Sequence, residues 1–297
     1  SQLRPYHTYY FAHGIFLMTV PQAPEFVLKA SCPATSGVIS RVSTYLADRG
    51  CYINELAQYD DQLTGKFFMR AVCEIRTGDQ TIESIEETFS EVADDFEMKF
   101  SFHDTRQPMR VVIMVSKHDH CLDDLLYRHR KGELSMEITA IVSNHLDLRP
   151  MAEREGIRFI YLPVTKDNKL QQEEALMGVI EETQSDLLIL ARYMQILSNN
   201  LCAKLRGQAI NIHHSFLPGF KGARPYYQAF DRGVKLIGAT AHYVTADLDE
   251  GPIIEQSVQP VDHTFGPEEL TAAGRDSENI ALAKAVKLHL DHRVFMD

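Results

Sequence analysis

The run RVVIMVS at residues 110–116 decides the fold of most of this chain. Residues 111–115 are all apolar, and successive side chains on a strand point to opposite faces of a sheet. A strand that is apolar at every position is therefore typical of a sheet covered on both faces. Such strands occur mainly in parallel sheets flanked by helices, so this run predicts an α/β domain.

Residues 110–297 repeat this pattern, with strand-like runs separated by segments of helical periodicity. Further strands are predicted at residues 136–144, 158–164, 185–193, 208–215, 235–245 and 251–261. Helices are predicted between and after them, at residues 120–132, 147–156, 171–184, 198–207 and 266–294. This alternation predicts a mostly parallel, doubly wound α/β fold.

Residues 25–104 are organised differently and predict a separate α+β domain. The order is strand, helix, strand, strand, helix, strand, which is the ferredoxin-like arrangement. The predicted elements are residues 25–31, 35–50, 51–62, 65–76, 80–96 and 97–103. The polar residues 105–109 are expected to link the two domains. Residues 1–24 are expected to be a leader outside both domains, or else a segment that packs on a partner subunit.

Composition narrows the classes of function. The 297 residues carry a formal net charge of −11, which disfavours nucleic-acid binding because that needs a phosphate-neutralising basic surface. The apolar run near the N-terminus is too short and interrupted to cross a membrane. Five scattered cysteines without a C-x-x-C pair predict neither a disulfide framework nor a zinc site, and favour the reducing cytoplasm. We expect no metal.

The chemistry is predicted where the strand at residues 208–215 ends. Asn211 and His213 are two residues apart and therefore project to one side, at the strand end where open α/β sheets bind ligands. Asp249 lies in a polar loop between two apolar strands. An amide can stabilise an oxyanion, an imidazole can move protons, and a carboxylate can orient that imidazole or a water molecule. The alternatives are a structural histidine and an aspartate that serves only a turn.

Residues 211–256, NIHHSFLPGFKGARPYYQAFDRGVKLIGATAHYVTADLDEGPIIEQ, closely resemble the folate-dependent formyltransferase and deformylase superfamily. The resemblance implies that Asn211, His213 and Asp249 are catalytic and that His242 lies near them. It implies that LARYMQIL, residues 190–197, lines the pteridine pocket, with Arg192, Tyr193, Met194, Ile196 and Leu197 as folate-binding residues. The folate is the substrate, so no cofactor is expected.

Among the branches of this superfamily, the chain resembles the formyltetrahydrofolate deformylases best. Glycinamide ribonucleotide formyltransferases carry a glycine-rich phosphate loop, whereas residues 116–125 read SKHDHCLDDL. Methionyl-tRNA formyltransferases add a basic C-terminal domain that binds tRNA, whereas this chain is acidic overall, with a formal net charge of −11. The resemblance implies hydrolysis of 10-formyltetrahydrofolate to formate and tetrahydrofolate, which supplies formate for purine synthesis and balances one-carbon folate pools. The alternatives are formyl transfer to a small amine and a non-catalytic folate- or amino-acid-binding regulator.

The N-terminal domain resembles the ACT domains of the deformylases. That implies a homodimer or homotetramer and an amino-acid effector at the ACT domain. Ala34, Ser36 and Tyr52 depart from the residues common in that family, which puts amino-acid sensing in doubt.

The glutamate tail of the folate is anionic and needs cationic partners. Lys221 and Arg224, together with Arg192, flank the motif loops and are expected to contact this tail.

Overall fold

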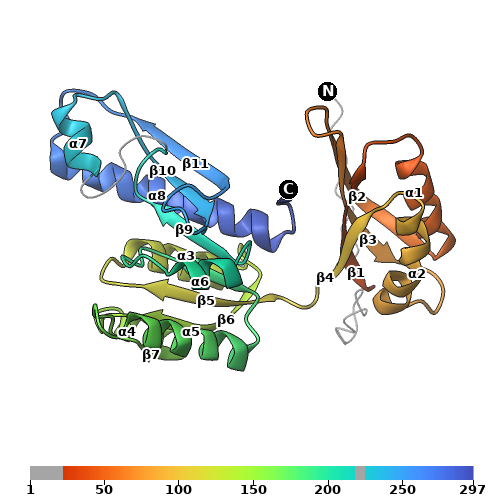
Figure 1. Cartoon of the computed structure of the whole chain (residues 1–297), viewed down its shortest axis with the longest axis horizontal. Coiled ribbons are helices and arrows are strands. Elements are labelled where there is room, and N and C mark those ends of the chain that lie inside the picture. Colours follow the sequence, from red (N-terminus) through yellow and green to blue (C-terminus); the bar gives the residue numbers. More distant parts are fainter. Residues whose placement is uncertain (1–22, 218–224, 297) are drawn as a thin grey trace, which may run out of the picture. The chain divides into compact units, whose positions relative to one another are not determined.

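The computed structural model describes residues 23–217 and 225–296, which form two compact units divided between Thr105 and Arg106 (Figure 1). The first unit ends with strand β4, and the second opens with strand β5. All but the last two residues of the expected leader lie outside the described residues. Each unit has its own sheet and core.

The first unit is a four-stranded antiparallel sheet with the order β2-β3-β1-β4. This is the strand order of the ferredoxin-like arrangement, so the predicted α+β fold is confirmed. Its elements are β1 (Glu25–Pro33), α1 (Val38–Asp48), β2 (Cys51–Asp61), β3 (Lys66–Ile75), α2 (Ile82–Asp94) and β4 (Lys99–Asp104).

The core of the first unit lies between its sheet and the two helices. Phe89 of α2 is fully buried and meets the rings of Tyr45, Phe100 and Phe102 at centroid distances of 5.2, 4.9 and 5.3 Å. Helix α2 starts with a reciprocal capping box, in which Thr81 and Ser84 bond each other's backbone N–H groups. One aromatic side chain therefore joins both helices to the last strand.

The second unit holds a seven-stranded sheet with the order β11-β10-β9-β8-β5-β6-β7. Strands β5 to β9 pair in parallel, whereas β10 and β11 are antiparallel, so the mostly parallel sheet is confirmed. The strands are β5 (Met109–Val115), β6 (Met136–Ser143), β7 (Phe159–Tyr161), β8 (Leu187–Leu190), β9 (Ala209–His213), β10 (Leu236–Tyr243) and β11 (Ile253–Pro260).

Helices cover both faces of this sheet (Figure 1). Val111, Ile113 and Val115 of β5 pack in one core, and Val112 and Met114 pack in the other, as the apolar run predicts. The first core includes residues of α3 (His120–Arg130), α4 (Arg149–Arg154) and α8 (Pro267–Leu290), and the second includes residues of α5 (Lys169–Thr183) and α6 (Asn199–Lys204).

The structure differs from the expected elements in three places. Strand β7 has only three residues because Pro163 cannot extend it. Strand β8 stops at Leu190, so residues 191–193 belong to an irregular segment and not to the strand. Helix α7 (Pro225–Asp231) was not expected; Pro225 at its first position is suited to a helix start. Within residues 23–217 and 225–296, no helix is long and apolar enough to span a membrane.

Replacing Phe89 with alanine removes the ring that joins α1, α2 and β4. We expect the free energy of unfolding of the first unit to fall by about 3–5 kcal/mol, the usual cost of removing a buried aromatic ring. Chemical denaturation followed by circular dichroism measures it. Leu63→Ala is the matched control, because that side chain is 97% exposed, and it should leave stability unchanged. Equal stability of both variants would contradict this view of the core.

Candidate active site

A pocket of about 680 Å³ opens in the second unit at the ends of three neighbouring parallel strands. Its walls come from the segments that follow β5 and β8, from the end of β9, and from the loop between β10 and β11. The chain leaves β5 toward β6 on one side and returns to β8 on the other. The pocket therefore lies at the topological switch point, where open α/β sheets bind their ligands.

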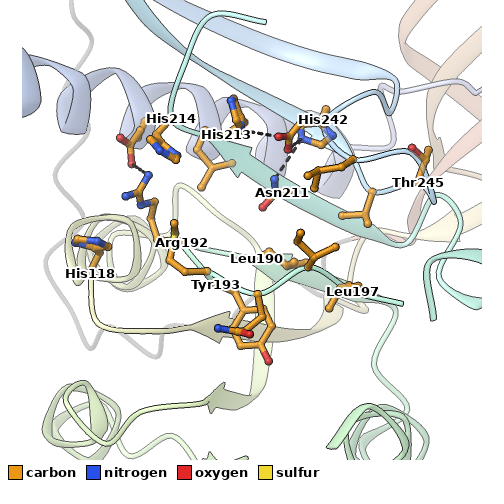
Figure 2. A pocket seen from close by; sticks show the side chains of 18 of the residues that line it. His118, Leu190, Arg192, Tyr193, Leu197, Asn211, His213, His214, His242 and Thr245 are labelled. Carbon is orange, nitrogen blue, oxygen red and sulfur yellow. Dashed lines mark hydrogen bonds and ion pairs between the residues drawn. The ribbon is translucent and has the colours of Figure 1, made fainter. Parts of the chain in front are cut away.

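Asn211 is held by its cross-strand neighbour, His242. The register of β9 and β10 pairs these two residues, and Asn211 Nδ2 lies 3.2 Å from His242 Nε2 (Figure 2). His242 Nδ1 lies 2.9 Å from the carbonyl oxygen of Tyr243, which can only accept, so Nδ1 carries the proton. Burial lowers the pKa of His242, so the ring is neutral at pH 7 and its Nε2 accepts from the amide. The second amide N–H of Asn211 is not used in this contact.

His213 and Asp249 form a hydrogen-bonded pair in the wall of the pocket. Nδ1 of His213 lies 3.2 Å from Oδ2 of Asp249, and both side chains are largely buried. Burial alone would raise the pKa of Asp249, but the hydrogen bond from His213 outweighs this and the pKa is lowered. The ionised carboxylate therefore accepts from Nδ1. Nε2 of His213 is buried without a hydrogen-bond partner among the described residues.

The loop that carries Asp249 has a strained backbone and passes very close to the end of β10. Asp249 has a φ of 57°, in the left-handed region that non-glycine residues rarely adopt. Two residues later, a Cβ on Gly251 would lie 1.7 Å from the carbonyl oxygen of Tyr243 and 3.3 Å from Nδ1 of His242. Only glycine lets the loop pass this close. Backbone strain of this kind gathers at functional sites, where it costs about 1–3 kcal/mol.

The segment expected to line the pteridine pocket does line this pocket. Tyr193 and Leu197 are buried against the core, whereas Met194 and Ile196 are half exposed. The backbone N–H of Met194 donates to Ser116 Oγ at 3.1 Å, which ties this segment to the end of β5. Folate binding by these residues stays a prediction. Lys221 and Arg224 lie outside the described residues.

A second polar cluster, which the sequence did not predict, lies in the same pocket. Glu278 of α8 is only 1% exposed; its Oε2 lies 2.8 Å from His120 Nε2, and its Oε1 accepts from the Tyr226 hydroxyl at 2.8 Å. Arg192 Nη1 lies 3.4 Å from Oε2. Burial would raise the pKa of Glu278, but the hydrogen bond from His120 and the charge of Arg192 lower it, so the carboxylate is ionised.

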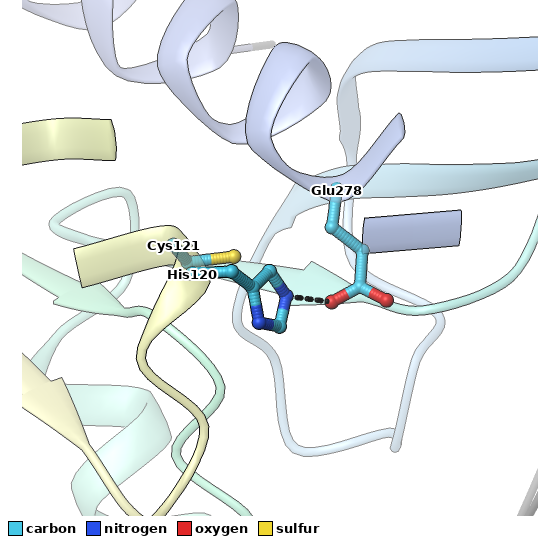
Figure 3. Close-up of side chains that lie close together, drawn as sticks. All are labelled: His120, Cys121 and Glu278. Atoms are coloured by element: carbon cyan, nitrogen blue, oxygen red, sulfur yellow. Dashed lines mark hydrogen bonds and ion pairs between the residues drawn. The ribbon is translucent and has the colours of Figure 1, made fainter. Parts of the chain in front are cut away.

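His120, Cys121 and Glu278 place three potential metal ligands within 4.8 Å of one another (Figure 3). Burial raises the pKa of the Cys121 thiol well above its ordinary value, whereas a metal-bound cysteine is a thiolate. The Arg192 guanidinium next to Oε2 of Glu278 also opposes a further cation. These donors therefore suit a hydrogen-bonded cluster better than a metal centre. The absence of a catalytic metal stays a prediction.

Known proteins resemble this chain over most of its length. The sequence profile of the family described as formyl transferase matches residues 109–286. A formyltetrahydrofolate deformylase of Corynebacterium sp. is 48% identical over 270 residues, which cover 91% of this chain and 94% of that protein. The chain belongs to the formyltetrahydrofolate deformylases.

Solved structures lead to the same family. The formyltetrahydrofolate deformylase of Burkholderia mallei has a TM-score of 0.87 and 51% identity, covering 92% of this chain and 96% of its own. A glycinamide ribonucleotide transformylase of Symbiobacterium toebii has a TM-score of 0.60 and 27% identity, and covers only 64% of this chain. The deformylases therefore match both units together, whereas the transformylase matches a smaller part.

Gly251→Ala should displace the Asp249 loop, because the added methyl group overlaps the carbonyl of Tyr243. We expect turnover to fall about a hundredfold, the loss that accompanies a misplacement of about 1 Å in a catalytic group. Steady-state kinetics measures it. Gly178→Ala is the control, since its added Cβ meets no atom within 4 Å and it lies in α5, where alanine is favoured. Full activity of Gly251→Ala would show that the loop position is unimportant.

His214, whose ring is 5.3 Å from that of His213, should stay neutral through the physiological range. Burial, followed by the charge of Arg192, lowers its pKa to about 4. Its ring resonances in NMR should hold constant from pH 8 to pH 5.5. An unfolded chain protonates this histidine at about 6.5, so the free energy of unfolding should fall as the pH drops from there toward 4. A His214 titration midpoint above pH 6 would contradict the burial argument.

Proposed function

We propose that this chain hydrolyses 10-formyltetrahydrofolate to formate and tetrahydrofolate in the pocket at the ends of β5, β8 and β9. Membership of the deformylase family supports the reaction. The observation that carries the choice of site is the contact between His213 and Asp249 next to Asn211 in one pocket. The pteridine contacts residues 190–197, at and after the end of β8, and the formyl group lies at the end of β9.

Attack begins with a water molecule that Asp249 and His213 orient. The depressed pKa of Asp249 keeps this carboxylate ionised, so it accepts a hydrogen bond from the Nδ1–H of His213 and leaves the Nε2 lone pair pointing away from it. His213 Nε2 takes a proton as the water oxygen bonds to the formyl carbon. General base catalysis of this kind contributes about 10²–10⁴ in rate.

The tetrahedral intermediate carries an oxyanion, and Asn211 is the side chain that stabilises it. Its amide is fixed by one N–H donated to His242, which leaves the other N–H for the developing charge. A well-placed oxyanion donor is worth roughly 2.7–4 kcal/mol. His242 acts through Asn211 as a positioning residue, because its protonated Nδ1 bonds the backbone and its Nε2 accepts from the amide.

Collapse of the intermediate breaks the bond between the formyl carbon and N10. The electron pair of that bond goes to N10, which takes the proton held by the His213 imidazolium. The carbon leaves as formic acid, which loses its proton at neutral pH. One water and one 10-formyltetrahydrofolate therefore give tetrahydrofolate, formate and one proton. The scheme uses no cofactor.

Formate from this reaction would supply purine synthesis and balance the one-carbon folate pools. All five cysteines are buried thiols without disulfides, which favours the cytoplasm. The first unit is an ACT domain that joins subunits into a dimer or tetramer. Ala34, Ser36 and Tyr52 depart from the residues common in ACT domains, which argues against a strong response of this unit to an amino-acid effector.

Asp249→Asn keeps the size of the side chain and removes its charge. We expect formate release from 10-formyltetrahydrofolate to fall by about 10³-fold or more, since His213 loses the acceptor that fixes its tautomer. Formate is measured with a coupled dehydrogenase assay. Asp167→Asn, a change of the same kind at an exposed position, should retain full activity.

Two results would contradict the proposed function. Unchanged formate release by Asp249→Asn would remove this carboxylate from the mechanism. Turnover that requires an added amine, such as glycinamide ribonucleotide, and gives no formate without it would identify a formyltransferase.

A further inference from the structure

Arg192 is a buried cation in the pocket with unused hydrogen-bond donors. Its side chain is 9% exposed, and it lines the pocket with Asn211 and His213. Its Nη1 lies 3.4 Å from Glu278, which makes an ion pair but lacks the geometry of a hydrogen bond. Neither Nε nor Nη1 has a hydrogen-bond partner among the described residues. A buried guanidinium with unsatisfied donors is costly unless a ligand completes it.

The backbone at Arg192 supports a ligand-binding role independently. Its φ is 64°, in the left-handed region, directly after strand β8 ends. A non-glycine residue in this conformation is strained, and such strain persists mainly where function requires a side chain at that position. Asp249 in the same pocket shows the same strain.

The groups around Arg192 hold it in place without satisfying it. Glu278 is fully buried and already engaged by His120 and Tyr226, so it orients the guanidinium and does not meet a ligand. His118 and His214 are the neighbours on the pocket side. Burial, and then the charge of Arg192, lowers the pKa of both rings, so both are neutral hydrogen-bonding groups at pH 7.

We propose that Arg192 binds the carboxylate of formate after hydrolysis, which makes this end of the pocket a product site. The inference rests on the proposed function. A guanidinium presents parallel N–H groups that match the two oxygens of a carboxylate. The path from the reaction centre is short, because the rings of His213 and His214 are 5.3 Å apart and His214 lies beside Arg192 (Figure 2).

The carboxylate could in principle come from formate or from the glutamate tail of the folate. The sequence led us to expect a tail contact, but the burial of Arg192 favours formate. A polyglutamate tail must continue into solvent, whereas this guanidinium is nine-tenths buried. Moving formate to Arg192 also separates it from the His213–Asp249 pair, which opposes the reverse reaction.

Titration of the full-length protein with ¹³C-formate, followed by NMR, tests the site directly. Arg192→Lys keeps the charge next to Glu278 but loses the forked donor geometry. We expect formate to bind roughly tenfold more weakly to Arg192→Lys, which corresponds to about 1.4 kcal/mol. Arg206→Gln, at an exposed position outside the pocket, should bind formate like the unchanged protein.

A second measurement needs no variant. Formate should shift the ring resonances of His214 in the unchanged protein and leave those of the exposed His263 unaffected. Equal formate affinity of Arg192→Lys and the unchanged protein, or no shift of His214, would overturn the proposal. The proposal would also be overturned if Arg192→Lys raised the KM only for polyglutamylated substrate, because Arg192 would then bind the glutamate tail. The binding measurements do not require turnover, so their failure is distinguishable from a failure of the formate-release assay.

Discussion

The contact between His213 Nδ1 and Asp249 Oδ2 is the interaction on which the rest of the site depends. A neutral imidazole has one protonated nitrogen, and this contact decides which one. With the proton on Nδ1, the lone pair of Nε2 is free to accept a proton from water. If the carboxylate were displaced or protonated, the same ring could take the other tautomer and lose its role as a base. In the proposed mechanism, the geometry of Asp249 therefore determines whether His213 can act as a base.

The fold provides this geometry through two kinds of rigidity. Asn211 and His213 lie on β9, a strand within the sheet, so neither can shift without disturbing the core. Asp249 lies on a loop, and the close approach at Gly251 and the left-handed backbone at Asp249 itself fix that loop. Next to His242 the register of β10 and β11 shifts, and Ile254 is the extra residue on β11. The amide, the imidazole and the carboxylate are thus positioned before substrate binds.

The sequence was sufficient for some parts of this arrangement and not for others. Residues 111–115 predicted the doubly wound sheet, and the spacing of Asn211 and His213 placed both at a strand end, because these signals are local. The pairing of Asn211 with His242 depends on the register of β9 and β10, and no local sequence pattern predicts that register. The Arg192–Glu278 ion pair joins the end of β8 to α8, and only the folded chain brings these residues together. The sequence also did not predict the end of β8 at Leu190, because Ala191 and Tyr193 alternate with the charged Arg192 as in a continuing strand.

The central claim is that an amide, an imidazole and a carboxylate act together on one formyl carbon. A crystal structure of this chain with a non-hydrolysable 10-formyl folate analogue tests it most directly. We expect the formyl oxygen to lie within hydrogen-bonding distance of Asn211 Nδ2, and an ordered water between the formyl carbon and the His213–Asp249 pair. A formyl group bound away from these three residues, with the analogue fully ordered, would contradict the account.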